Sequence, residues 1–169
     1  MHHFFAMMSR MKYIERWALM RNSIPENISE HSLEVSMLAH ALAVIGNRRF
    51  GKSLNAEKAA LIGLYHDSTE ILTGDMPTPI KYYNPEIKKA FKDIEDTAAR
   101  NLLSLLPEDM QADYLDIFFP NEEEAYLHRL VKAADKLSAL IKCIEEAKTG
   151  NKEFVSAQAT LQQSIVEMH

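Results

Sequence analysis

The chain has 169 residues, of which 47% are hydrophobic, and its formal net charge is −5. This size suffices for one compact domain with a substantial core and leaves little room for two, so we expect a single domain over residues 1–169. The charge is acidic and the basic residues are scattered, which argues against a nucleic acid polymer as a partner.

No stretch approaches the length of a membrane span, and the apolar run at residues 4–8 is interrupted before it reaches the length of a signal-peptide core. Cys143 is the single cysteine, so no internal disulfide can form. We therefore expect no membrane partner, and the cytoplasm is the default compartment.

The dominant hydrophobic period is helical and no alternating run argues for a sheet, so the fold class that we predict is all-α, a helical bundle. The predicted helices cover residues 5–14, 28–45, 55–72, 85 to about 107, 121 to about 149, and a last stretch that reaches 169. That last stretch carries no stop signal, which leads us to expect that the chain is cut short there.

Short signals separate these helices. Asn27 and Glu30 form a capping box for the second predicted helix. The segment 73–79 contains Gly74 and two prolines, which predict a stiff loop. The acids at positions 122–124 follow Asn121, a predicted cap, and complement the helix dipole. An apolar stripe in the helix from residue 85 predicts core packing and consists of Ile87, Phe91, Ile94, Ala98 and Leu102.

His66, Asp67 and Glu70 follow the apolar run at residues 59–64. If the helix continues at roughly 100° per residue, these three side chains share one arc that has little solvated surface. A buried carboxylate without a partner costs several kcal/mol, so something positive must compensate Asp67. The adjacent imidazole favours a divalent cation over a lysine or arginine.

Two further ligands come from other predicted helices. His31 lies in the first turn after Asn27, and Asp135 lies at the edge of an apolar stripe. Alone, His31 would more often be a surface or capping histidine and Asp135 would usually pair with a lysine. His128 shares a face with Asp135, but seven residues of helical rise, roughly 10 Å, exclude it from the same ion.

The order of His31, then His66-Asp67, then Asp135 resembles the HD-domain metal-dependent phosphohydrolase superfamily. Within it, the segments 9–12, 16–22, 26–32, 65–70 and 73–79 closely resemble the bacterial HD-domain 5′-deoxynucleotidases. The most specific parts are Arg16-Trp17 and the loop Gly74-Asp75-Met76-Pro77-Thr78-Pro79. The resemblance covers nearly the whole chain and implies an HD-domain fold and a homodimer.

The resemblance implies one divalent ion, Co, Mn, Zn, Ni, Fe or Mg, bound by His31, His66, Asp67 and Asp135. It implies a deoxyribonucleoside 5′-monophosphate as the substrate, held against a set of residues that partly overlaps the ligands: Arg16, Trp17, His31, Asp67, Asp75, Met76, Pro77, Thr78 and Asp135.

The resemblance also implies roles for individual side chains; without it, Arg16 would be read as a solvated charge and Trp17 as a core aromatic. Arg16 orients the phosphate, and Trp17 crowds the 2′ position of the sugar, where a hydroxyl would lose its hydration without gaining a partner. Glu70 orients or deprotonates the attacking water. Asp75 either binds the remaining sugar hydroxyl or protonates the leaving 5′-oxygen.

Two alternatives remain open. The first is an HD phosphohydrolase for another nucleotide, namely a triphosphate, a cyclic dinucleotide or a guanosine polyphosphate, which should require more basic residues than Arg16 and Lys81. The second is a non-catalytic, metal-binding helical signalling module, which would need neither Glu70 nor Arg16.

Overall fold

The computed structural model describes residues 3–81, 83–122 and 124–168. Within these ranges the chain is helical, and the one extended pairing is an isolated antiparallel bridge between Glu15 and Asn27. The all-α prediction is therefore confirmed. The elements in chain order are α1 (Phe4–Met8), the 3₁₀ helix η1 (Ser9–Tyr13), α2 (Ile28–Phe50), α3 (Ala56–Tyr65), α4 (Glu70–Thr73), α5 (Thr78–Lys81), α6 (Pro85–Leu103), α7 (Glu108–Phe118), α8 (Ala125–Lys148), η2 (Lys152–Phe154) and α9 (Val155–Val166).

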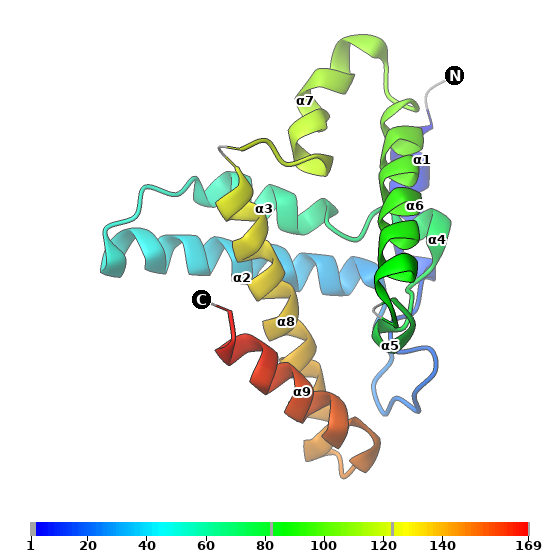
Figure 1. The fold of residues 1–169 in the computed structure, drawn as a ribbon, viewed down its shortest axis with the longest axis vertical. Helices are drawn as coiled ribbons and strands as arrows, with labels where there is room; N and C mark the ends of the chain where they lie inside the picture. The colour runs from blue at the N-terminus through cyan, green and yellow to red at the C-terminus, as the bar shows by residue number, and fades with distance from the viewer. Residues whose placement is uncertain (1–2, 82, 123, 169) are drawn as a thin grey trace.

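The centre of the molecule is formed by three helices. α3 runs beside α2, and α8 crosses both of them (Figure 1). Their shared core is rich in alanine, which lets the helix backbones approach closely, and it consists of Val35, Ala39, Ala43, Ala59, Ile62, Leu127, Val131 and Ala134. Because α2, α3 and α8 carry His31, the segment before His66, and Asp135, this packing brings the predicted ligands toward one another.

At Gly63 the backbone of α3 lies close to the backbone of α2 at Ser36. A methyl group at this position would lie 3.0 Å from the Cα atom and 3.1 Å from the backbone nitrogen of Ser36. Backbone atoms cannot swing aside as a flexible side chain can, so any larger residue would push the two helices apart. Glycine at position 63 is therefore needed for the spacing between His31 and His66.

The remaining elements pack around this centre. α1 lies beside α6, and its Phe4 is buried against Leu102, Leu103 and Leu106 (Figure 1). At the other side of the molecule α9 runs back along α8 (Figure 1). None of the described helices combines the length and the apolar character that crossing a membrane requires.

Several predicted boundaries were wrong. The helix expected to end at residue 45 continues to Phe50, because Gly46 stays helical and the left-handed turn falls on Gly51, whose φ is 63°. The helix expected at 5–14 is divided into α1 and η1. α7 was missed altogether; of its residues Ile117 is buried and the others are half-buried or exposed.

The long helix begins later than predicted. Asn121 does accept a hydrogen bond from the backbone N–H of Glu124, at 2.8 Å, but it does so in a turn before α8 starts at Ala125. Glu123 lies outside the described residues. In the stripe predicted for α6, Phe91, Ala98 and Leu102 are buried, whereas Ile87 is 37% exposed and Ile94 is 53% exposed.

The most consequential difference lies at the site itself. The helix predicted over residues 55–72 is interrupted between α3 and α4 by the turn 66–69. Here Ser68 N–H donates to Tyr65 at 3.0 Å and Glu70 N–H donates to Asp67 at 2.9 Å, both to the carbonyl three residues earlier. The angles of a continuous helix therefore do not describe how His66, Asp67 and Glu70 are arranged.

Candidate active site

His31 is fully buried in the first turn of α2. The predicted capping box is present. The side chain of Asn27 accepts hydrogen bonds from the N–H groups of Ser29 and Glu30, at 3.0 and 3.1 Å, and the side chain of Glu30 accepts one from the N–H of Asn27. This cap fixes where α2 begins, and so it fixes the position of the His31 ring.

Hydrogen bonds determine which nitrogen of His31 carries the proton. Ser138 donates its hydroxyl proton to Glu34 Oε2, at 2.5 Å, so its oxygen is left to accept from His31 Nδ1, 3.0 Å away. With the proton on Nδ1, the lone pair on Nε2 faces Asp67 and Asp135. Such an imidazole is prepared to bind a cation through Nε2.

His66 is oriented in the same way by the backbone. Its Nδ1 donates to the carbonyl oxygen of Gly63 at 2.7 Å. Its Nε2 is buried, lies 3.2 Å from Oδ1 of Asp67 and makes no well-aligned hydrogen bond within the described residues. A metal ion bound between the imidazole and this carboxylate would take the place of a proton on Nε2.

His31, His66 and Asp67 each offer one ligand atom, and these atoms lie within 4.8 Å of one another. Asp135 joins from α8, with its Oδ1 3.1 Å from Nε2 of His31. Two imidazole nitrogens and two carboxylates are a donor set that suits several divalent ions, so the residues fit the implied metal. Three of the four predicted ligands therefore form one cluster, and Asp135 lies beside it through its contact with His31.

The charges at this cluster support one another. Burial opposes the charge on His66, but the adjacent Asp67 outweighs it and raises the pKa of His66 to about 9. Burial likewise works against the charge of Asp67, yet His66, His31 and Arg16 hold its pKa well below the usual range. The carboxylates are therefore ionised at neutral pH, and they surround a point where positive charge is stabilised.

Glu70 follows one turn later at the start of α4. Its Oε2 is buried and makes no hydrogen bond within the described residues. Burial, together with the nearby charges of Asp67 and Asp75, raises the pKa of Glu70 to about 9. A carboxyl group with a raised pKa in a cleft is suited to proton transfer.

Arg16 reaches the cluster from the loop between η1 and α2. Its Nη1 donates to Oδ2 of Asp67 at 3.3 Å, and its Nε lies 3.6 Å from Glu26. The side chain is only 11% exposed. Burial alone would lower the pKa of Arg16, but the surrounding acids raise it, so the guanidinium provides fixed positive charge beside the proposed ligands.

Trp17 occupies a strained backbone conformation. Its φ of 58° lies in the left-handed region, which costs a residue other than glycine about 1–2 kcal/mol. Its backbone N–H donates to Oδ2 of Asp75 at 3.2 Å, and its indole Nε1 donates to Glu26 at 3.0 Å. Such strain persists where the surroundings fix it, and it often marks a functional residue.

The loop after α4 begins with Gly74, whose φ of 72° requires glycine, and continues through Asp75. Burial raises the pKa of Asp75. Met76 and Pro77 are half-buried and Thr78, at the start of α5, is exposed. The structure therefore links Asp75 to Trp17 directly, while the other three residues extend the same loop.

Three residues near the predicted ligands were not predicted. Glu26 contacts Arg16 and Trp17 and lies 3.6 Å from Nδ1 of His31, and Glu34 and Ser138 set the His31 proton as described above. Glu26 lies five residues before His31, between Pro25 and the cap Asn27. In the sequence, an acidic residue directly before the cap of α2 was the signal that could have identified Glu26 as a site residue.

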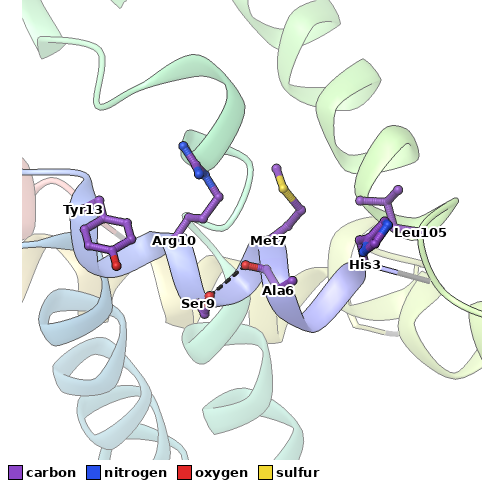
Figure 2. Close-up of a pocket in the computed structure, with 7 residues that line it drawn as sticks. All are labelled: His3, Ala6, Met7, Ser9, Arg10, Tyr13 and Leu105. Atoms are coloured by element: carbon purple, nitrogen blue, oxygen red, sulfur yellow. Dashed lines mark hydrogen bonds between the residues drawn. The ribbon is translucent and has the colours of Figure 1, made fainter. Parts of the chain in front are cut away.

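A cavity of about 260 Å³ adjoins the cluster. Its lining includes residues of α6, α7 and α8, with His128 among them. It also includes four residues of the predicted site, namely His66, Asp67, Glu70 and Asp135. A second cavity, of about 510 Å³, lies away from these groups between α1, η1 and Leu105 (Figure 2). Its lining holds His3 and Arg10 but no carboxylate, so it lacks the donor set of the first.

Comparison with known proteins gives a consistent result. A family model described as 5′-deoxynucleotidase YfbR-like matches residues 3–169. The chain is 51% identical over 165 residues to a 5′-deoxynucleotidase of Vibrio parahaemolyticus, covering 98% of this chain and 85% of that protein. It is also 51% identical over 168 residues to a 5′-deoxynucleotidase of Yersinia pestis, with coverage of 98% and 84%.

Solved structures show the same fold. An HD-domain phosphohydrolase from Listeria innocua aligns with a TM-score of 0.85 at 23% identity, covering 98% of this chain and 79% of that one. A cyanophage S-2L HD phosphohydrolase, bound to dA and one catalytic Zn²⁺ ion, aligns with a TM-score of 0.67 at 21% identity, with coverage of 95% and 80%.

Proposed function

The chain belongs to the YfbR-like 5′-deoxynucleotidase family and is thus a phosphoric monoester hydrolase, and we propose that it hydrolyses deoxyribonucleoside 5′-monophosphates at the cluster around His31 and His66. The observation that carries the proposal is the convergence of His31, His66 and Asp67 beside the buried guanidinium of Arg16. The products are a deoxyribonucleoside and inorganic phosphate.

His31, His66, Asp67 and Asp135 would hold one divalent ion. When bound, such an ion supplies a Lewis acid that polarises a phosphoryl oxygen and lowers the pKa of water. The protein prepares the site by fixing the protons of both histidines on Nδ1, through Ser138 and through the carbonyl of Gly63.

Arg16 binds and orients the phosphate. Its guanidinium is held by Asp67 and Glu26, so its direction is set before the substrate arrives. Charge developing on the phosphoryl oxygens is stabilised by such a fixed cation without reorganisation at the moment of reaction. The cluster beside Arg16 also includes His31, Asp67 and Asp135. These residues would therefore contact the same phosphate.

Glu70 accepts the proton of the attacking water. It lines the cavity next to His66 and Asp67, and one of its oxygens has no hydrogen-bond partner within the described residues. The positive charge of a divalent ion at the neighbouring cluster would offset the negative charge of Asp67, which raises the pKa of Glu70. It would thus favour the ionised form of Glu70 at neutral pH. General-base catalysis of this kind contributes roughly 10²–10⁴-fold to the rate.

Trp17 and the loop from Asp75 to Thr78 hold the sugar. The indole is fixed against the 2′ position, where a ribose hydroxyl would be desolvated without a partner. Asp75 meets either the 3′-hydroxyl or the leaving 5′-oxygen. Burial raises the pKa of Asp75, which is the direction that protonation of the leaving 5′-oxygen requires.

The test is phosphate release after chelation and single-metal add-back, with Mn²⁺, Co²⁺, Zn²⁺, Ni²⁺, Fe²⁺ and Mg²⁺ tried in turn. We expect turnover of dAMP to exceed that of AMP and to exceed that of the deoxynucleoside di- and triphosphates. Equal turnover of dAMP and AMP would remove the deoxyribose assignment. Silence with every metal would favour a non-catalytic metal-binding module.

The role of Glu70 is tested by Glu70→Gln. We expect kcat to fall roughly 10²–10⁴-fold while the protein retains its metal, because the general base is lost and the ligands are not. Glu57→Gln, an exposed acid in the first turn of α3, is the matched control and should retain full activity. Full activity of Glu70→Gln would exclude Glu70 as the base.

We also infer a homodimer in the cytoplasm. α2 exposes Leu33, Met37 and Val44, which lie at helical spacing and are 55%, 59% and 37% exposed. A second copy of the chain would cover such an apolar face. Size-exclusion chromatography with light scattering tests this, and a monomer at all concentrations would contradict it.

A further inference from the structure

The loop that carries Arg16 and Trp17 is held in place from the opposite side by the end of α8 and by η2. Glu146, which is fully buried, accepts hydrogen bonds from the backbone N–H groups of Ser23 and Ile24 at 2.9–3.1 Å. Asn151 bridges the two segments, since it donates to the carbonyl of Arg21 at 2.7 Å and to Glu146 at 2.8 Å. The loop is therefore tied to a part of the chain some 120 residues away.

Glu146 is an unusual residue for this position. A buried carboxylate is costly unless it is fully paired, and its partners here include Lys142, whose Nζ lies 2.6 Å away and also donates to the carbonyl of Ile24. Each partner of the Glu146 carboxylate either belongs to the loop or makes its own hydrogen bond to the loop. The buried pair therefore connects α8 to the backbone of the loop at Ser23 and Ile24.

Phe154 completes the arrangement. It is fully buried, and its ring lies 5.3 Å from the ring of Trp17. Trp17 cannot relax its left-handed backbone freely, because Asn22 also donates to its carbonyl oxygen at 3.2 Å. The indole is thus fixed by Phe154 on one side and by the bond to Glu26 at its nitrogen.

On the basis of the proposed function, we propose that Phe154 and Glu146 are positioning residues that hold the Trp17 indole where it excludes a 2′-hydroxyl. They contact neither the cluster nor the substrate. They act through Trp17, whose position decides how much room the sugar has. Selectivity for the deoxyribonucleotide then depends on residues from α8 and η2 that lie outside the site.

Trp17 is the single tryptophan, so fluorescence excited at a wavelength that tryptophan absorbs and tyrosine does not reports its surroundings alone. Phe154→Leu keeps an apolar side chain but removes the ring beside the indole. In the metal-free full chain we expect acrylamide quenching of Trp17 to rise about twofold, because the indole gains local freedom. With metal, we expect the ratio of kcat/KM for dAMP over AMP to fall about tenfold.

Phe4→Leu is the matched control, since Phe4 is equally buried but packs in the separate cluster with Leu102 and Leu106. It should lower thermal stability comparably and leave both readouts unchanged. If Phe154→Leu lowers thermal stability but changes neither the quenching nor the ratio, Phe154 is a core residue only and the proposal is overturned.

Glu146→Gln tests the second residue independently. It retains an oxygen for the N–H groups of Ser23 and Ile24 but loses the charge that Lys142 requires. We expect greater quenching of Trp17 and a lower ratio, and Glu145→Gln, its exposed neighbour, should show neither. Unchanged quenching and ratio in a folded Glu146→Gln would exclude Glu146 as a positioning residue.

Failure of the proposed function gives a different result from failure of this inference. If the wild type does not distinguish dAMP from AMP, the deoxyribose assignment is lost. The quenching of Trp17 in the metal-free protein would still decide whether Phe154 and Glu146 fix the indole.

Discussion

Nε2 of His31 lies 3.1 Å from Oδ1 of Asp135, although 104 residues separate them in the chain. The same nitrogen lies 3.5 Å from Oδ2 of Asp67. Because the oxygen of Ser138 accepts a hydrogen bond from Nδ1–H of His31, the lone pair of Nε2 points between two carboxylates. Positive charge at that point would stabilise all three groups, which is the physical basis for the proposed metal site.

The metal-free protein should become less stable as the pH rises from about 6.5 to 9. The pKa of His66 is raised to about 9 in the folded state, so its stabilising effect is complete below the unfolded pKa near 6.5 and is lost as the pH rises through 9. Glu70, also raised to about 9, acts in the same direction, since its folded state binds the proton more tightly than the unfolded chain.

The loss attributable to His66 is on the order of 3 kcal/mol, since one unit of pKa corresponds to about 1.4 kcal/mol. Urea unfolding at a series of pH values measures it. His66→Gln should give a shallower decline, and His40→Gln, at an exposed site on α2, should give the wild-type decline. A free energy of unfolding that is constant over this range would contradict the raised pKa values.

Ser138→Ala should weaken metal binding by about 10–100-fold, the usual effect of removing the group that orients a metal-binding histidine. Without the serine oxygen, Nδ1 of His31 loses its acceptor at 3.0 Å and keeps only the more distant Glu26, at 3.6 Å, so the proton is held less firmly on Nδ1 and Nε2 is less available. Competition with a chromogenic chelator measures the affinity. Ser32→Ala is the control, because the Ser32 hydroxyl is buried without a hydrogen-bond partner in the described chain and should not affect binding.

Sequence patterns predicted the helical class, the capping box at Asn27 and the four proposed ligands, because each depends on local spacing or on residue type. They did not predict the turn at 66–69, since no glycine or proline marks the end of α3. Glu146 was missed for a related reason. Its role depends on a loop far away in the chain, and its own helix suggests an ordinary surface acid.

Gly63→Ala should destabilise the protein by about 1–3 kcal/mol and weaken metal binding as well. The added methyl group would lie 3.0 Å from the Cα atom of Ser36, and the separation of α2 and α3 sets the distance between His31 and His66. Gly46→Ala is the control on α2, because its methyl group would meet the flexible Leu54 side chain at 3.1 Å. Thermal unfolding and chelator competition, compared between the two variants, separate the effects.

Arg16→Lys should raise KM for dAMP by about 10–100-fold, in line with the 1.5–3 kcal/mol that a hydrogen bond to a charged group contributes. Lysine keeps the positive charge but cannot contact Asp67 and Glu26 together, so its direction toward the phosphate is lost. Metal affinity should change little, because Arg16 is not a ligand. Arg10→Lys, at an exposed position on η1, should leave KM unchanged. An Arg16→Lys enzyme with wild-type KM would show that charge alone, without the fixed geometry, is enough to bind the phosphate.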